Sequence, residues 1–555
     1  MKKRVISLLL VAAMTVGLVA CGSSSGDGKK SSASSDEKIL SVETGPDPET
    51  VDPALNSAID GGEMILHAFE GLLKLDENGD PEAGQAEKWE VSDDGLTYTF
   101  HLRDGLKWSD GSDLTAEDFV YSWQRVCDPN VAAPYASTVL GMVEGFDESG
   151  RLGSRFDEAA AGDIEKLGVE AKDDKTFVVH LANPCPYFES IAAFATLNPV
   201  QKATIDANGD AWATAADTYI SNGPFYVTEW VPGSYVLMKK NPNYWDADSI
   251  KLDGIKFNLI EDANAAYSAY QTGECQMIKD VPTEEIPSLK DSDDFHVEPI
   301  IGTYYLSLNL QKEPFNNKQV RQALSLAIDR DYVANTLMQG TYSPAGNLVG
   351  PGWKDTDGSD FSENANGGKE YISTTDYDAN LQKAKDLLKE AGYADGKGIP
   401  KITYSTNDAG YHKVVAEYLQ KAWGELGIDV DVEVVEWASF TPMRRNGDYM
   451  SSRNGWVGDY SDPSNILELF TTDNGNNDGK YSNPEFDAVI EKSRTTTDAA
   501  ERSAALHEAE DMLMDDAACI PVAYYNDFYL MSDKVTGAWH ASNGYWYFMY
   551  ADITE

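Results

Sequence analysis

The sequence has few basic residues, and this shortage excludes one class of partner. Its 555 residues include 92 Asp and Glu but only 44 Lys and Arg, which gives a formal net charge of −48. A nucleic-acid-binding protein needs a basic surface that neutralises phosphates, and anionic lipid attracts the same sign of charge. We therefore expect no nucleic acid partner and no adsorption of the whole surface to anionic lipid. Such acidity keeps a secreted protein soluble, and it weakly favours cationic ligands.

Cysteine is also scarce. Apart from Cys21 the chain has Cys127, Cys185, Cys275 and Cys519, which are widely spaced, form no Cys-x-x-Cys motif and have no histidine at metal-ligand spacing. Zinc binding and thiol redox chemistry are therefore not expected, and we predict no metal site. Four cysteines allow three disulfide pairings, and buried free thiols are an equal alternative.

The sequence lacks the short motifs of common enzymes. It has no Gly-x-Ser-x-Gly, no His-Glu-x-x-His, no phosphate-binding glycine loop and no supported cysteine–histidine pair. We predict a protein that is not an enzyme, with no catalytic residues and no cofactor. Stretches 76–80, 355–360 and 473–479 are rich in Asp, Asn and Gly; calcium binding is one interpretation of them, and loop turns are the one we expect.

Long apolar runs are absent except at the start of the chain. The basic segment 1–4 precedes the apolar residues 5–20, a run that is too short to span a membrane stably. Residues 1–20 are therefore predicted to be an export signal. It ends in Leu-Val-Ala-Cys (18–21), which looks like the bacterial lipobox and implies cleavage before Cys21 and a diacylglyceryl group on its thiol. The alternative is an ordinary signal peptide with a coincidental cysteine.

The residues after Cys21 are rich in Ser, Gly, Asp and Lys and cannot build a core, so 21–37 is predicted to be a lipidated flexible tether. The rest of the chain is too long for one hydrophobic core, so we expect two or three lobes. Its overall composition, 42% hydrophobic and 11% aromatic, is ample for globular packing.

Local patterns predict a mixed α/β protein. Residues 39–42 read as a strand, and Thr115 with Asp118 is a helix-capping pair that precedes Phe119, Trp123 and Val126 on one helix face.

Further along, 399–406 reads as a strand, 411–426 as an amphipathic helix and 428–434 as an alternating strand. Strand, helix and strand joined by short turns indicate a βαβ unit, which is normally right-handed. A second helix is predicted at 378–391, with Gly392 as its C-cap.

Segment 453–463, Arg-Asn-Gly-Trp-Val-Gly-Asp-Tyr-Ser-Asp-Pro, shows neither helical nor strand periodicity. Its glycines let another main chain approach closely, its aromatics offer flat apolar surface, and Asp459 can meet a positive charge. We interpret the segment as the wall of a ligand cleft. The alternative is a surface turn, because Asp-Tyr-Ser-Asp-Pro is good turn chemistry.

A series of collinear motifs runs from about residue 39 to residue 551. They are Leu-Lys-Trp-Ser-Asp-Gly (106–111), Thr-Ala-Glu-Asp-Phe-Val-Tyr-Ser-Trp-Gln-Arg (115–125), Pro-Tyr-Ala-Ser (134–137), Asn-Gly-Pro-Phe (222–225), Asn-Pro-Asn-Tyr-Trp (241–245), Pro-Phe (314–315), Val-Arg-Gln-Ala-Leu (320–324) and Gly-Trp-Val-Gly-Asp-Tyr (455–460). With these motifs the sequence resembles the oligopeptide-binding proteins of bacterial ABC importers, an extracytoplasmic solute-binding family that also includes dipeptide, nickel and murein-peptide receptors.

The resemblance implies an α/β, three-lobed periplasmic-binding-protein-like (type II) fold, with two jaws joined by hinge strands and an additional inserted α/β lobe. Carried over to this chain, lobe I is 38–69 with 196–301 and 526–555, the inserted lobe II is 70–195, and lobe III, the second jaw, is 302–525.

The resemblance also implies a peptide site. Asp459 takes the α-ammonium of the peptide, 455–457 (Gly455, Trp456, Val457) pairs with its backbone like an added strand, and Ile59 and Tyr135 add contacts. The same carry-over gives side-chain pockets lined by Trp437, Tyr304, Trp456 and Tyr524, and partners of the ligand carboxylate in Arg444, Arg453 and His412.

Each position has a plainer interpretation. Asp459 can be a turn-capping acid, Ile59 and Tyr135 packing residues, and Trp437 a core residue after the strand. Arg444 can belong to a solvated turn, and His412 can be an exposed residue at a helix start.

The chain departs from some relatives in two places. Gly302 and Val457 stand where those relatives tie the cleft loop by a disulfide, and no lysine for short peptides is carried over near 336–338. Preferred peptide length is therefore open.

The function implied is that of a monomeric substrate-binding lipoprotein that delivers short peptides to ABC permease subunits. It would be extracytoplasmic and anchored to the outer face of the bacterial cytoplasmic membrane. The alternatives are a lipid-anchored peptide sensor, or a receptor of the same family for dipeptides, nickel or haem, although few histidines fall in the matched cleft.

Overall fold

The computed structural model describes residues 37–554 except 129, 146–163 and 408–410. The predicted signal peptide, Cys21 and nearly all of the tether lie outside the described residues. Within the described part, no helix is both long enough and apolar enough to cross a membrane. The described residues from 38 onward group into one compact unit.

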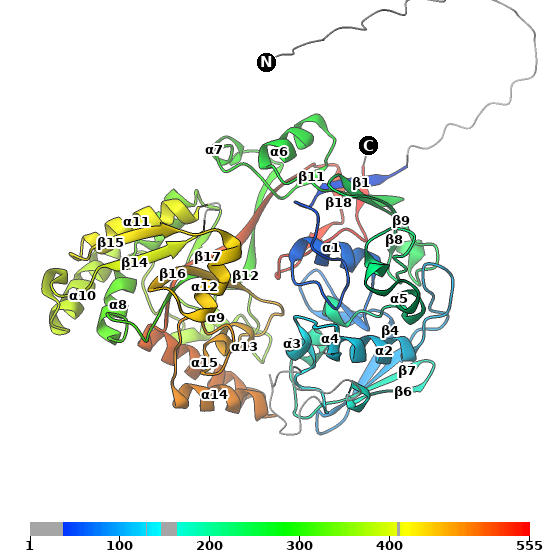
Figure 1. Cartoon of the computed structure of the whole chain (residues 1–555), viewed down its shortest axis with the longest axis horizontal. Helices are drawn as coiled ribbons and strands as arrows, with labels where there is room; N and C mark the ends of the chain where they lie inside the picture. The colour runs from blue at the N-terminus through cyan, green and yellow to red at the C-terminus, as the bar shows by residue number, and fades with distance from the viewer. Residues whose placement is uncertain (1–36, 129, 146–163, 408–410, 555) are drawn as a thin grey trace, which may run out of the picture. The chain divides into compact units, whose positions relative to one another are not determined.

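Two long antiparallel strands form the centre of the main sheet (Figure 1): β12 (Phe295–Leu308) and β17 (Cys519–Met531). The order of the sheet is β15-β14-β16-β12-β17-β11-β1-β10-β9-β8, and β13 (Ser343–Pro344) also pairs with β17. The other bounds are β1 Ile39–Glu43, β8 Phe225–Val231, β9 Tyr235–Lys240, β10 Gly254–Asn258, β11 Met277–Ile278, β14 Ile402–Thr406, β15 Val430–Val434 and β16 Ser451–Val457. β12 and β17 each run through a predicted boundary between lobes I and III.

A second, four-stranded antiparallel sheet lies within the predicted lobe II. Its order is β4 (Ala86–Val91), β5 (Thr97–Leu102), β7 (Thr176–His180) and β6 (Val169–Asp173). Helix α2 (Ala116–Cys127) covers it with buried Phe119 and Trp123, and the Trp123 ring meets Phe177 edge-on at 5.1 Å. The predicted cap is confirmed, because the Thr115 backbone N–H donates to Asp118 Oδ2 at 2.8 Å.

The predicted strand–helix–strand unit is also confirmed. β14 and β15 are parallel neighbours, and α11 (His412–Gly424) joins them while burying Val415, Leu419 and Trp423. Gly427 follows the helix with a φ of +81°, a conformation that glycine adopts without strain. Helix α10 (Tyr377–Glu390) ends before Gly392, whose φ is +87°.

The remaining helices and small strand pairs lie around these sheets. The helices are α1 Ile59–Ala68, α3 Ala136–Leu140, α4 Phe188–Ala192, α5 Lys202–Asn208, α6 Ala263–Thr272, α7 Ile286–Leu289, α8 Lys318–Leu326, α9 Phe361–Asn364, α12 Trp437–Asn446, α13 Ser464–Leu467, α14 Pro484–Thr495 and α15 Ala499–Asp516. Small strand pairs are β2 (Leu73–Leu75) with β3 (Pro81–Ala83), β18 (Val535–Thr536) with β21 (Asp552–Ile553), and β19 (Trp539–His540) with β20 (Trp546–Tyr547). Cys127, Cys185, Cys275 and Cys519 are all buried free thiols, the second of the two predicted alternatives.

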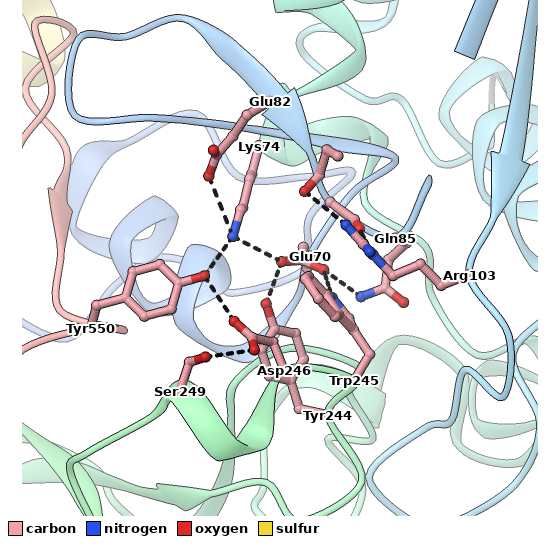
Figure 2. Close-up of polar contacts among 12 residues, drawn as sticks. Glu70, Lys74, Glu82, Gln85, Arg103, Tyr244, Trp245, Asp246, Ser249 and Tyr550 are labelled. Atoms are coloured by element: carbon pink, nitrogen blue, oxygen red, sulfur yellow. Dashed lines mark hydrogen bonds and ion pairs between the residues drawn. The ribbon is translucent and has the colours of Figure 1, made fainter. Parts of the chain in front are cut away.

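A buried carboxylate explains the Asn-Pro-Asn-Tyr-Trp motif. Figure 2 shows Glu70 accepting hydrogen bonds from the Tyr244 hydroxyl, from Trp245 Nε1 (2.6 Å) and from Gln85 Nε2 (2.6 Å). Lys74 Nζ lies 3.8 Å from Glu70 Oε1 and donates to the Tyr550 hydroxyl at 2.7 Å. The network joins the start of the predicted lobe II to two parts of the predicted lobe I, so the motif has a structural role here.

Candidate functional site

The predicted cleft wall begins as a strand. β16 pairs with β12 on one side, with Gly302 opposite Val457, Thr303 opposite Trp456 and Tyr304 opposite Gly455. On its other side β14 pairs only with Ser451 and Ser452. From Arg453 onward no described strand pairs with that edge of β16, so an added strand can pair there. Two main-chain groups of the segment have side-chain partners in the structure: the Arg453 carbonyl accepts from Arg444 Nη1 at 3.4 Å, and the Gly455 N–H donates to Asn454 Oδ1 at 2.9 Å. The surface-turn interpretation is therefore wrong for 453–457. Gly302 and Val457 lie opposite each other and neither is a cysteine, so no disulfide joins β12 to β16 at this place.

Asp459 follows the strand and faces a cleft. Its Oδ1 accepts a hydrogen bond from the Tyr135 hydroxyl at 3.0 Å, and its Oδ2 accepts one from Asn465 Nδ2 at 3.4 Å. No described basic side chain lies within 4.0 Å of it, while burial raises the pKa of the carboxyl and these two hydrogen bonds oppose the rise. Asp459 helps to line a cleft that is open to solvent. A carboxylate in this position can accept a cationic ligand group.

The rest of that cleft is largely aromatic and small. Beside Asp459 it is lined by Phe194, Ala195, Tyr545 and Tyr547, among others. Asn465 is a residue that the sequence did not reveal: its Oδ1 accepts hydrogen bonds from Trp456 Nε1 (2.7 Å) and from the Asp459 backbone N–H (3.3 Å). The only feature of the sequence that could have pointed to Asn465 is its position six residues after Asp459. Asn465 therefore fixes the positions of two predicted site residues at once.

Tyr135 and Ile59 differ in their surroundings. The Tyr135 ring packs on Phe194 at 5.1 Å while its hydroxyl reaches Asp459, so it both packs and takes part in the site. Ile59, the first residue of α1, is 41% exposed, which the packing interpretation does not predict. It is not among the residues that line the cleft at Asp459.

A second group of predicted residues gathers around Arg453. The Arg453 guanidinium lies 5.8 Å from the Tyr304 ring and 5.7 Å from the Trp437 ring, and the His412 ring lies 5.5 Å from Tyr304. Arg453 Nε, the Tyr304 hydroxyl and His412 Nδ1 are buried without a hydrogen-bond partner in the described chain. Burial, helped by Arg453, lowers the pKa of His412 to about 3, so His412 is neutral. Buried polar atoms without a partner are costly, so a polar ligand group or a water that reached them would be stabilising.

Three of the plainer interpretations are wrong here. Trp437 is 56% exposed and does not belong to the core. It is the first residue of α12 and does not continue the strand before it. His412 starts α11 as predicted but is buried against Tyr304. Arg444 is buried, not in a solvated turn, because Asp478 lies 3.5 Å away and Asn454 Oδ1 accepts from it.

That pairing changes the reading of Arg444. Its charge already has the Asp478 carboxylate as a partner, and it holds Asn454 of β16 in place. Arg444 thus supports the strand, whereas Arg453 has no carboxylate within 4.0 Å among the described residues; the Nε atoms of both arginines are buried without a hydrogen-bond partner there. Tyr524 on β17 is half-buried, and its hydroxyl accepts from the Asn347 backbone N–H at 3.1 Å, so it contacts the loop around 347 and not Asp459.

Two of the acidic loops have structural partners. Asp76 accepts from the backbone N–H groups of Asn78 and Asp80, each at 2.8 Å, and Asp355 accepts from His507 Nε2 at 2.8 Å if that nitrogen carries the proton. Over the described residues no group of three or more His, Cys, Asp or Glu side chains is arranged to hold a metal ion.

Comparisons with known proteins relate the chain to one family. The family model described as "Bacterial extracellular solute-binding proteins, family 5 Middle" matches residues 80–478. The chain is 35% identical over 563 residues to the oligopeptide-binding protein OppA of Bacillus subtilis (strain 168), covering 99% of both chains. It is 34% identical over 538 residues to the periplasmic oligopeptide-binding protein OppA of Salmonella typhimurium, covering 96% of this chain and 95% of the relative.

A solved structure is similar over nearly the same length. The crystal structure of Haemophilus influenzae OppA in complex with RPPGFSPFR has a TM-score of 0.75 and 30% identity, and the match covers 94% of this chain and 99% of that one.

Proposed function

The chain belongs to the family 5 bacterial extracellular solute-binding proteins, and from this premise we propose that it binds short oligopeptides at β16 for delivery to the permease of an ABC importer. The supporting observation is the open edge of β16, with an anionic group at one end and a cationic group at the other. An extended peptide has the complementary features: an ammonium, unpaired main-chain amides and a carboxylate.

In this proposal the peptide lies along 453–457 as an added strand. Its α-ammonium meets Asp459, which is where a buried carboxylate without a described cation would gain most from a positive charge. Its carboxylate points toward Arg453, whose Nε has no partner in the described chain. The seven residues from Arg453 to Asp459, joined by six steps of about 3.3 Å each, span at most about 20 Å, the length of roughly five or six peptide residues.

Main-chain pairing would make binding tolerant of sequence. Strand addition uses groups that every peptide has, so side chains need only roomy, hydrated pockets. Trp437, exposed beside Arg453, and Trp456, held by Asn465, are placed to give such pockets flat apolar walls.

We also propose the division into lobe I (38–69, 196–301 and 526–555), lobe II (70–195) and lobe III (302–525). Its support is that β12 and β17 run through the boundaries between lobes I and III, and that a separate sheet lies within 70–195.

The proposal includes lipid anchoring through Cys21 on the outer face of the cytoplasmic membrane, supported by the motif 18–21.

Native mass spectrometry of the purified protein, followed by calorimetry after ligand removal, tests the function. We expect co-purified masses that correspond to short peptides, and binding heats that are largest near five residues in a series from about two to eight. Absence of both a bound peptide mass and a binding heat at every length would contradict the proposal.

A further inference from the structure

Tyr187 makes an aromatic contact next to the proposed ammonium site, although no sequence motif pointed to it. It directly precedes α4 in the predicted lobe II. Its ring stacks on that of Tyr460 with a centroid distance of 4.8 Å and an interplanar angle of 10°. Tyr460 is the residue after Asp459. A contact made by Tyr187 therefore acts on the backbone that carries the proposed ammonium acceptor.

The Tyr187 ring also contacts the guanidinium of Arg502. Its Cζ lies 5.6 Å from the centroid of the Tyr187 ring, within the range of a cation–π contact. Arg502 is only 2% exposed, and its guanidinium is held by two hydrogen bonds to Asp462, both 2.9 Å, and by one from Nε to the Ser493 carbonyl at 3.1 Å. Because Arg502 is fixed in this way, it offers Tyr187 a rigid surface.

Other contacts join the same two predicted lobes, II and III. The Tyr135 hydroxyl donates to Asp459, and Lys354 forms an ion pair with Asp80. A cleft that is open to solvent lies beside the stack and is lined in part by Tyr187, Lys354 and Arg502. One side of the stack thus lies at the wall of a space that is open to solvent, where Tyr187 is half-buried and Tyr460 is buried.

We propose that Tyr187 is a positioning residue for ligand binding: its stack on Tyr460 and Arg502 stabilises the arrangement of lobes II and III in which Tyr135 and Asp459 meet the ligand. This inference rests on the proposed function. Tyr187 need not touch the peptide, because its contact stabilises the ligand-holding arrangement and so adds to the observed affinity. Its loss should act mainly on the dissociation rate.

The test compares Tyr187→Ala, Tyr187→Phe and the wild-type protein with an unlabelled pentapeptide. We expect Tyr187→Ala to raise the Kd about tenfold, mainly through faster dissociation, in keeping with the loss of one aromatic stack and one cation–π contact. Tyr187→Phe keeps the ring and should stay within about threefold of wild type. Tyr121→Ala is the matched control, because Tyr121 lies on α2 in the same predicted lobe and its ring meets Lys202 instead.

A second readout separates positioning from general destabilisation. Spin labels at Lys172 and Lys492, both well exposed, report the distance between the two lobes by pulsed electron resonance. With peptide present, Tyr187→Ala should show a larger share of long distances than wild type, and Tyr187→Phe and Tyr121→Ala should not.

Three outcomes would overturn the inference. Wild-type protein that binds no peptide removes the proposed function and this inference with it. Wild-type protein that binds, with unchanged affinity and label distances in Tyr187→Ala, removes the inference alone. A Tyr187→Phe variant as weak as Tyr187→Ala would show that the ring stack is not responsible.

Discussion

Replacing Asp459 by Asn removes the charge proposed to bind the peptide amine and keeps the shape of the side chain. In the structure the carboxylate has two neutral donors, Tyr135 at 3.0 Å and Asn465 at a long 3.4 Å, and no described cation within 4.0 Å. Truncating one partner of a buried charge pair costs about 2–5 kcal/mol, or about 30-fold to about 5,000-fold in Kd. Because the two neutral donors already satisfy part of the carboxylate, we expect about 100-fold.

The assay is a double-mutant cycle by calorimetry. The two proteins are wild type and Asp459→Asn, and the two ligands are a pentapeptide with a free amine and its des-amino analogue, which lacks the amine without added bulk. We expect the variant to lose about 100-fold for the first ligand and little for the second, a coupling free energy of about 3 kcal/mol. An N-acetylated peptide should behave like the des-amino analogue, apart from the cost of the acetyl group.

The control is Asp473→Asn, which removes an exposed acid of the predicted lobe III and should leave both affinities unchanged. If Asp459→Asn weakens both ligands equally, the coupling is close to zero and the reasoning about the amine is refuted.

Three further predictions follow from charge and burial. Affinity for free-amine peptides should fall as the pH falls through the raised pKa of Asp459, because the protonated acid cannot pair with the ammonium; titration calorimetry across pH should show this for wild type and not for Asp459→Asn. Burial raises the pKa of Glu510 from 4.5 to about 8, so between pH 4.5 and pH 8 the folded protein keeps a proton that the unfolded chain loses, and the free energy of unfolding falls as the pH rises. In denaturant titrations at several pH values, Glu510→Gln should remove about 1.4 kcal/mol of that fall per pH unit. Parallel pH profiles of the variant and the wild type would contradict this prediction. Arg453→Gln should weaken peptides with a free carboxylate about tenfold and C-terminal amides much less; equal losses by calorimetry would remove Arg453 from that role.

The sequence was sufficient for the parts of the fold that local patterns determine. The cap at Thr115, the helix before Gly427 and the alternating strand after it depend on residues within a few positions of one another, and the structure has all three. The family, and with it the α/β periplasmic-binding-protein type of fold, followed from collinear motifs and is confirmed by the comparisons.

Side-chain environments were harder to predict because their partners lie far away in the chain. Arg444 looks like part of a solvated turn until Asp478, 34 residues later, is placed beside it. The surroundings of Trp437 and His412 likewise depend on how α12 and α11 begin near Arg453. Tyr187 gave no signal at all, since its partners are more than 250 residues away.

The most direct test is a crystal structure of the protein with a bound pentapeptide. The account predicts the peptide nitrogen at hydrogen-bond distance, about 2.7–3.2 Å, from an Asp459 carboxylate oxygen, and main-chain hydrogen bonds between the peptide and 453–457. A peptide bound elsewhere, or in the cleft with its amine directed away from Asp459, would contradict it.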